Sequence, residues 1–209
     1  LLAPVLNMAL FEGRLSLNDK VSDYLVCTPY TEVTIAQLLT HTSGIGYYAY
    51  VTDNLWGMPE NPMVNADLLT MMECDEVPIY FDHGRGFDYC NTNYTLLASI
   101  VESVTNTSFK KHMELTVFPS LEMEDSEILD PFSKDATDYD VQGHYPSGDL
   151  KLPSYLDGVV GDKGVYSTVG DLYAFYNSIR TQNSISDSLW LEATTPQAKT
   201  GANAYYGYG

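Results

Sequence analysis

The amino-acid sequence predicts a mainly α-helical chain with few short strands. Two segments carry apolar side chains at helical spacing, one from Thr92 to Val104 and one from Val169 to Ile179. A third segment, Leu1 to Phe11, is apolar almost all round, as is typical of a helix buried at the centre of a domain. The stretches between helices are rich in Gly, Pro, Asn and acidic residues, and few strands can be placed in them.

The shorter elements follow from capping residues and loop composition. Thr34 and Ser108 are good N-caps, because a side-chain oxygen there satisfies a free backbone N–H of the first helical turn. The shorter predicted helices span residues 35–40, 65–72, 108–115 and 187–192. We expect an irregular stretch after His41, mostly loop over 122–158, and a compact turn over 161–168. No linker or repeat divides residues 1–209, which we treat as one segment.

Composition excludes several classes of partner. The chain has 28 acidic and 10 basic residues, a formal charge of −18, which would repel a nucleic-acid backbone. There is no run of about 18 apolar residues, so no membrane-spanning segment is predicted. The three cysteines lack Cys-x-x-Cys spacing and the histidines lack ligand spacing. We therefore expect no metal site.

Four blocks of sequence, taken together and in this order, carry a family resemblance. They are FEGRLSLNDKVSDYL at 11–25, TIAQLLTHTSGI at 34–45, FDYCNTNY at 87–94 and GVYSTVGDLY at 164–173. Each block alone is weak, but the ordered set is specific. The chain resembles the serine β-lactamase-like and penicillin-binding-protein superfamily, which includes D-alanyl-D-alanine carboxypeptidases, class C β-lactamases and related esterases.

The resemblance implies an α+β parent of the β-lactamase/transpeptidase type, an antiparallel sheet with a helical region inserted. Residues 1–209 correspond to the central portion of such a protein, mostly its helical region. On this interpretation the segment lacks the N-terminal strands with the Ser-x-x-Lys element and also the C-terminal strands. The nucleophilic serine is then expected just before Leu1.

The resemblance assigns the chemistry of the segment to Tyr89 and Asn91. Members of the family combine a Ser-x-x-Lys nucleophile, a Tyr-x-Asn or Ser-x-Asn element, and a Lys-Thr-Gly or His-x-Gly strand. Tyr89-Cys90-Asn91 matches the second element. Tyr89 is then the proton relay, a role that needs a phenol whose pKa is lowered by a nearby ammonium, and Asn91 positions the substrate. The alternative is a loop tyrosine packed beside an asparagine that caps the next helix.

Two other sequence matches are expected to be coincidental. Ser108-Phe109-Lys110-Lys111 fits Ser-x-x-Lys, but helix capping explains Ser108 fully. Lys199-Thr200-Gly201 fits the third element, but it precedes residues 206–209, which resemble the strand found before that element in relatives. We expect the true third element beyond Gly209.

The loop after residue 40 supplies three further candidates. In relatives its histidine ends a helix and opens a loop, so we expect His41 to hold that turn by hydrogen bonds and not to act as a base. Tyr47 and Tyr48 lie where relatives border the cleft, so they are candidate substrate contacts. Ordinary packing is the alternative for both tyrosines.

The resemblance implies hydrolysis or transfer of a small peptide, amide or ester through an acyl-enzyme intermediate, without a cofactor. The segment alone is expected to be inactive. The alternative is a non-catalytic homologue that binds peptides or glycans in the same cleft. The family also favours a periplasmic or secreted bacterial protein, and the sequence leaves the oligomeric state open.

Overall fold

The fold was examined in a computed structural model, which describes residues 13–26, 30–57, 61–74, 77–129, 143–181 and 187–209. The helix predicted over residues 1–11 lies outside this part of the chain. The described helices are η1 (Val21–Asp23, 3-10), α2 (Ile35–Leu39), α3 (Tyr48–Leu55), α4 (Asn65–Glu73), α5 (Asn91–Thr105), α6 (Phe109–His112), η2 (Met113–Val117, π), α7 (Phe118–Ser120), η3 (Tyr155–Gly158, 3-10), α8 (Val169–Arg180) and α9 (Asp187–Thr194).

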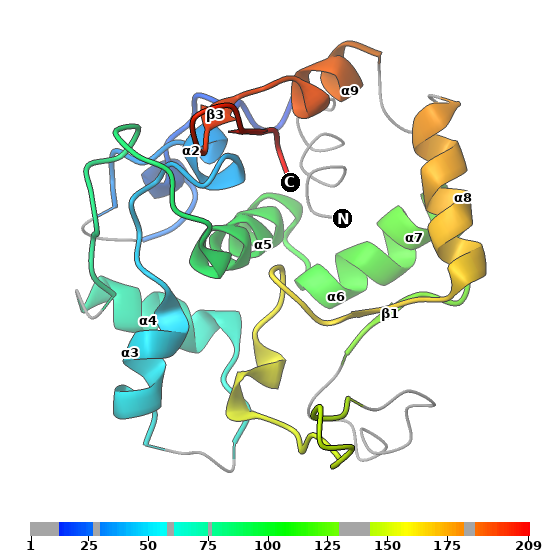
Figure 1. The fold of residues 1–209 in the computed structure, drawn as a ribbon, viewed down its shortest axis with the longest axis horizontal. Coiled ribbons are helices and arrows are strands. Elements are labelled where there is room, and N and C mark those ends of the chain that lie inside the picture. The colour runs from blue at the N-terminus through cyan, green and yellow to red at the C-terminus, as the bar shows by residue number, and fades with distance from the viewer. Residues whose placement is uncertain (1–12, 27–29, 58–60, 75–76, 130–142, 182–186) are drawn as a thin grey trace.

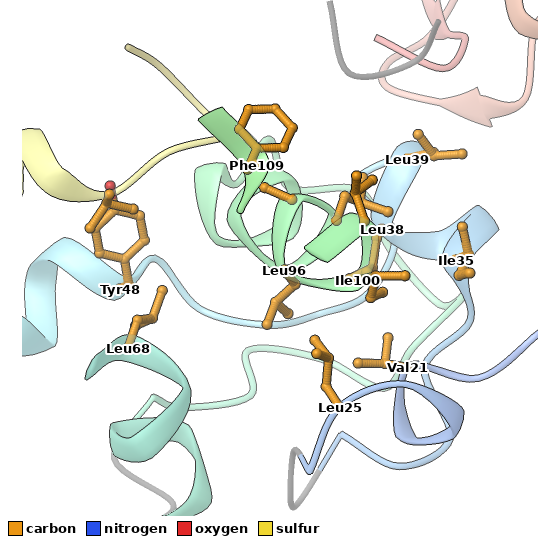
Figure 2. Close-up of a cluster of buried hydrophobic side chains, with 14 of the residues drawn as sticks. Val21, Leu25, Ile35, Leu38, Leu39, Tyr48, Leu68, Leu96, Ile100 and Phe109 are labelled. Atoms are coloured by element: carbon orange, nitrogen blue, oxygen red, sulfur yellow. The ribbon is translucent and has the colours of Figure 1, made fainter. Parts of the chain in front are cut away.

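Helix α5 forms the centre of the fold, and α2, α4 and α6 pack against it (Figure 1). Its apolar stripe includes Leu96, Leu97 and Ile100, which are fully buried. Figure 2 shows Leu96 and Ile100 facing side chains from the surrounding helices and loops. Burying each of these side chains stabilises the fold by about 1.5–3 kcal/mol.

The helix ends follow the capping residues in the sequence. Thr34 accepts a hydrogen bond from the backbone of Gln37, whose side chain in turn accepts from the Thr34 N–H. Ser108 accepts from Lys111 N at 3.3 Å and so caps α6. Asn106 ends α5 in the left-handed conformation, which asparagine tolerates better than most residues.

The strands are short and form two antiparallel pairs. Strand β1 (Glu127–Ile128) pairs with β2 (Val165–Tyr166), so that Ile128 lies opposite Val165. Strand β3 (Ala198–Lys199) pairs with β4 (Tyr205–Tyr206) in a hairpin. The expectation of a mainly helical segment with few short strands is confirmed. Over the described residues, no helix combines the length and apolar character needed to cross a membrane.

Two parts of the structure differ from the sequence prediction. The stretch after His41 was expected to be irregular, but it contains α3, which begins without a side-chain cap and is held by tertiary contacts. The helix predicted over 108–115 continues as a π-helical turn into α7 and ends at Ser120. Pro119 lies near the end of this helix, just after the π-helical turn.

Candidate active site

Tyr89 and Asn91 line a common cavity of about 510 Å³. The cavity lies where the start of α5 meets the turn before β2 and the end of the chain. One part of its wall is polar and another is formed by apolar side chains of α6 and β2. The lining residues are Tyr89, Asn91, Tyr94, Phe109, Met113, Gly161, Asp162, Lys163, Gly164, Val165, Tyr206 and Gly209.

Tyr89 lies in the extended segment immediately before α5 and leaves 64% of its surface exposed. Its ring packs against His41, with ring centroids 4.3 Å apart, and contacts Tyr206 edge-on at 6.3 Å. The ring is thus supported on one side and accessible on the other. This is the position that a group exchanging protons with a bound substrate requires.

Asn91 is the first residue of α5 and is half-buried. The N-cap of the helix is Cys90, and its side chain makes no capping hydrogen bond. The capping role considered for Asn91 is therefore not seen. Asn91 lines the cavity close to Tyr47, whose pKa is raised by burial.

His41 holds the segment that carries Tyr89, as expected from its position. Its Nδ1 accepts the backbone N–H of Cys90 at 3.1 Å, and its carbonyl oxygen accepts the N–H of Asp88 at 3.0 Å. The side-chain amide of Asn93 lies 3.2 Å from the same Nδ1. Because Nδ1 accepts hydrogen bonds, the ring proton sits on Nε2. Burial lowers the pKa of His41 to about 4, so the ring is neutral at pH 7.

The two tyrosines considered as substrate contacts differ in position. Tyr47 is half-buried near Asn91 and is not one of the residues that line the cavity. Tyr48 is fully buried and packs in the core (Figure 2). The packing alternative therefore describes Tyr48, which supports the cavity wall from behind.

Sequence reasoning missed a charged pair in the wall of the cavity. Asp162 accepts a hydrogen bond from the Tyr48 hydroxyl at 2.9 Å, and Lys163 Nζ donates to the same hydroxyl at 2.7 Å. Lys163 Nζ also lies 3.5 Å from the Asp162 carboxylate. The sequence predicted only a compact turn in this region, which includes Gly161 and Gly164. No feature of that turn indicates a contact with Tyr48.

The two motif matches that were expected to be coincidental lie in ordinary structural positions. Ser108 caps α6, as expected, because its hydroxyl oxygen accepts the backbone N–H of Lys111. Lys199 is an exposed residue of β3, and Thr200 N donates to Ala204 O within the hairpin turn. Among the described residues, no cluster of three His, Cys, Asp or Glu side chains is arranged to hold a metal ion.

The chain belongs to the β-lactamase family, since the family model of that description matches residues 1–209. It is 30% identical to Penicillin-binding protein 4* of Bacillus subtilis (strain 168) over 212 residues, covering 95% of this chain and 47% of the relative. The chain therefore spans about half the length of this curated relative.

Solved structures agree with this family. A penicillin-binding protein from Bacillus halodurans is 27% identical with a TM-score of 0.82, and the match covers 99% of this chain and 64% of that one. The octameric penicillin-binding protein homologue from Pyrococcus abyssi is 26% identical with a TM-score of 0.77, covering 99% of this chain and 50% of that one. The β-lactamase-like fold predicted for the parent is thus confirmed.

Proposed function

We propose that the protein carrying this chain is a serine acyl-hydrolase that cleaves or transfers small peptides, amides or esters through an acyl-enzyme intermediate. The supporting observation is that Tyr89 and Asn91 line one cavity, with the Tyr89 ring held by His41 and open on its other side. Membership of the β-lactamase family and the likeness to a penicillin-binding protein support the same reaction class. The family resemblance favours a bacterial protein that is exported to the periplasm or secreted.

In this proposal a serine attacks the substrate carbonyl and two backbone amides hold the resulting oxyanion. The serine belongs to a Ser-x-x-Lys element that precedes Leu1. Tyr89 relays its proton to the leaving group, and Asn91 offers its amide to the substrate. Water or an amine then releases the acyl group. No metal or organic cofactor takes part.

The proposal is tested by covalent labelling of the full-length protein with a fluorescent penicillin and with a fluorophosphonate. We expect one stable label on the full-length protein and none on residues 1–209 alone. A full-length protein that neither probe labels and that hydrolyses no ester would favour the alternative, a non-catalytic homologue that binds peptides or glycans. Stable labelling of residues 1–209 alone would place the nucleophile inside this segment and contradict the assignment.

A further inference from the structure

A lysine is held rigidly in the wall of the cavity that contains Tyr89 and Asn91. Lys163 lies in the turn between η3 and β2, and 35% of its side chain is exposed. Its neighbour Asp162 also lines the cavity, but only 1% of the Asp162 side chain is exposed. The charged group that this wall presents to a bound molecule is therefore an ammonium.

The ammonium is fixed from behind by buried groups. Lys163 Nζ donates to the Tyr48 hydroxyl at 2.7 Å and lies 5.5 Å from the centre of the Tyr48 ring. That hydroxyl donates to Asp162 at 2.9 Å, so the tyrosine connects the two charges. A lysine normally loses rotamer entropy when it binds an anion. Here part of that entropy is already lost in the folded protein, which favours binding.

The charge of Lys163 contrasts with the rest of the molecule. The chain carries 28 acidic and 10 basic residues. Among the side chains that line the cavity in the described structure, Lys163 is the only cation. An acidic surface repels anions in general, so a fixed cation in the cavity that Tyr89 and Asn91 also line would select where an anion binds.

We propose that Lys163 is a specificity-determining residue that binds an anionic group of the acyl substrate, such as a carboxylate, beside the bond that is cleaved. This inference rests on the proposed acyl-hydrolase function. Asp162 and Tyr48 act as positioning residues, because they orient the ammonium and do not reach the substrate. A lysine that served only as the counter-ion of Asp162 would stabilise the fold without discriminating between substrates.

The test compares kcat/KM of the full-length protein for two matched ester pairs. One pair places the carboxylate on the acyl chain, 4-nitrophenyl hydrogen adipate against 4-nitrophenyl hexanoate. The other places it on the leaving group, 3-carboxy-4-nitrophenyl acetate against 4-nitrophenyl acetate. Lys163 is expected to reach the carboxylate of only one of the two pairs. In that pair, Lys163→Met should lower kcat/KM of the anionic ester about tenfold or more, as expected for loss of a charge-assisted hydrogen bond. The neutral ester should change less than about twofold.

Three variants control for a merely structural effect. Lys163→Arg should keep the preference for the anionic ester, and Lys151→Met, at an exposed position outside the cavity lining, should leave it unchanged. Asp162→Asn combined with Lys163→Met removes both charges and should match Lys163→Met alone. Equal losses for both members of each pair, or no loss, would overturn the inference.

Failure of the proposed function would be visible separately, as absence of turnover of all four esters by the unmodified protein. Binding then decides the role of Lys163, measured by NMR titration of the full-length protein with hexanoate and hexanamide. At least about tenfold weaker binding of hexanoate alone in Lys163→Met supports the inference. Equal binding of the two compounds by the unmodified protein contradicts it.

Discussion

The imidazole of His41 accepts the backbone N–H of Cys90 through Nδ1 at 3.1 Å, and this bond fixes the residue between Tyr89 and Asn91. The ring of His41 also packs against Tyr89. His41 itself adopts a left-handed backbone conformation, with φ of 56°, which is uncommon outside glycine. A buried, neutral histidine thus connects the loop after α2 with the candidate catalytic segment.

This arrangement predicts that acid destabilises the protein through His41. Burial lowers the pKa of the folded protein's His41 to about 4, from an ordinary value of 6.5. Between these values the unfolded chain binds more protons than the folded chain, so the free energy of unfolding falls as pH drops from 6.5 towards 4. The expected loss is up to about 3 kcal/mol at pH 4, and it fades as pH rises past 6.5.

The contribution is isolated by urea unfolding of the full-length protein and of His41→Asn at pH 7 and pH 5. Asparagine tolerates the left-handed backbone but does not titrate, so this variant should lose less stability on acidification. Burial raises the pKa of Tyr94 and of Tyr206, which contact the His41 ring, so neither changes charge in this pH range. His83→Asn, at an exposed position, is the matched control, and equal pH dependence in all three proteins would contradict the prediction.

The buried bond between Ser43 and Asn93 predicts a strong energetic coupling. Ser43 Oγ donates to Asn93 Oδ1 at 2.6 Å, and both side chains are inaccessible. Either alanine substitution leaves a buried polar partner unsatisfied, so each should lower the free energy of unfolding by about 1–3 kcal/mol. The double variant should lose less than the sum of the two. Additive losses in a double-mutant cycle would mean that the pair does not interact.

Gly161 is predicted to be the residue of the cavity turn least tolerant of substitution. Its φ is +106°, and an added Cβ would lie 2.5 Å from the Tyr94 carbonyl oxygen and 2.7 Å from Ala98 Cβ. Gly161→Ala should lower the free energy of unfolding by at least about 2 kcal/mol. Gly143→Ala, whose Cβ meets nothing closer than 3.6 Å, should change it by less than about 1 kcal/mol, measured by thermal unfolding. Equal effects would refute the steric argument.

The elements that sequence predicted well are those specified by nearby residues. Helix α5 was expected over 92–104 and spans 91–105, because its apolar stripe is long and periodic. Thr34 and Ser108 cap their helices as expected, since a cap depends on residues three positions away. Helix α3 was missed, because Tyr47 before it offers no capping side chain.

The candidate site was predicted only in part, because its parts come from distant segments. Tyr89 and Asn91 were predicted from the Tyr-x-Asn match together with the other blocks that carry the family resemblance. The bond between Lys163 and Tyr48 joins residues 115 positions apart, so no local pattern predicts it. The proton position on His41 also depends on packing, because the N–H that Nδ1 accepts comes from Cys90.

The role of Tyr89 leads to the most direct prediction for catalysis. Tyr89→Phe in the full-length protein should slow acylation by a fluorescent penicillin about 100-fold or more, the usual contribution of a positioned proton-transfer group. The fold should be unaffected, because the ring still packs on His41 and 64% of Tyr89 is exposed. Tyr145→Phe, at another exposed tyrosine outside the cavity lining, serves as the matched control. Since only the hydroxyl is lost, an unchanged acylation rate would show that Tyr89 carries no proton in the reaction, and the cavity would need another relay.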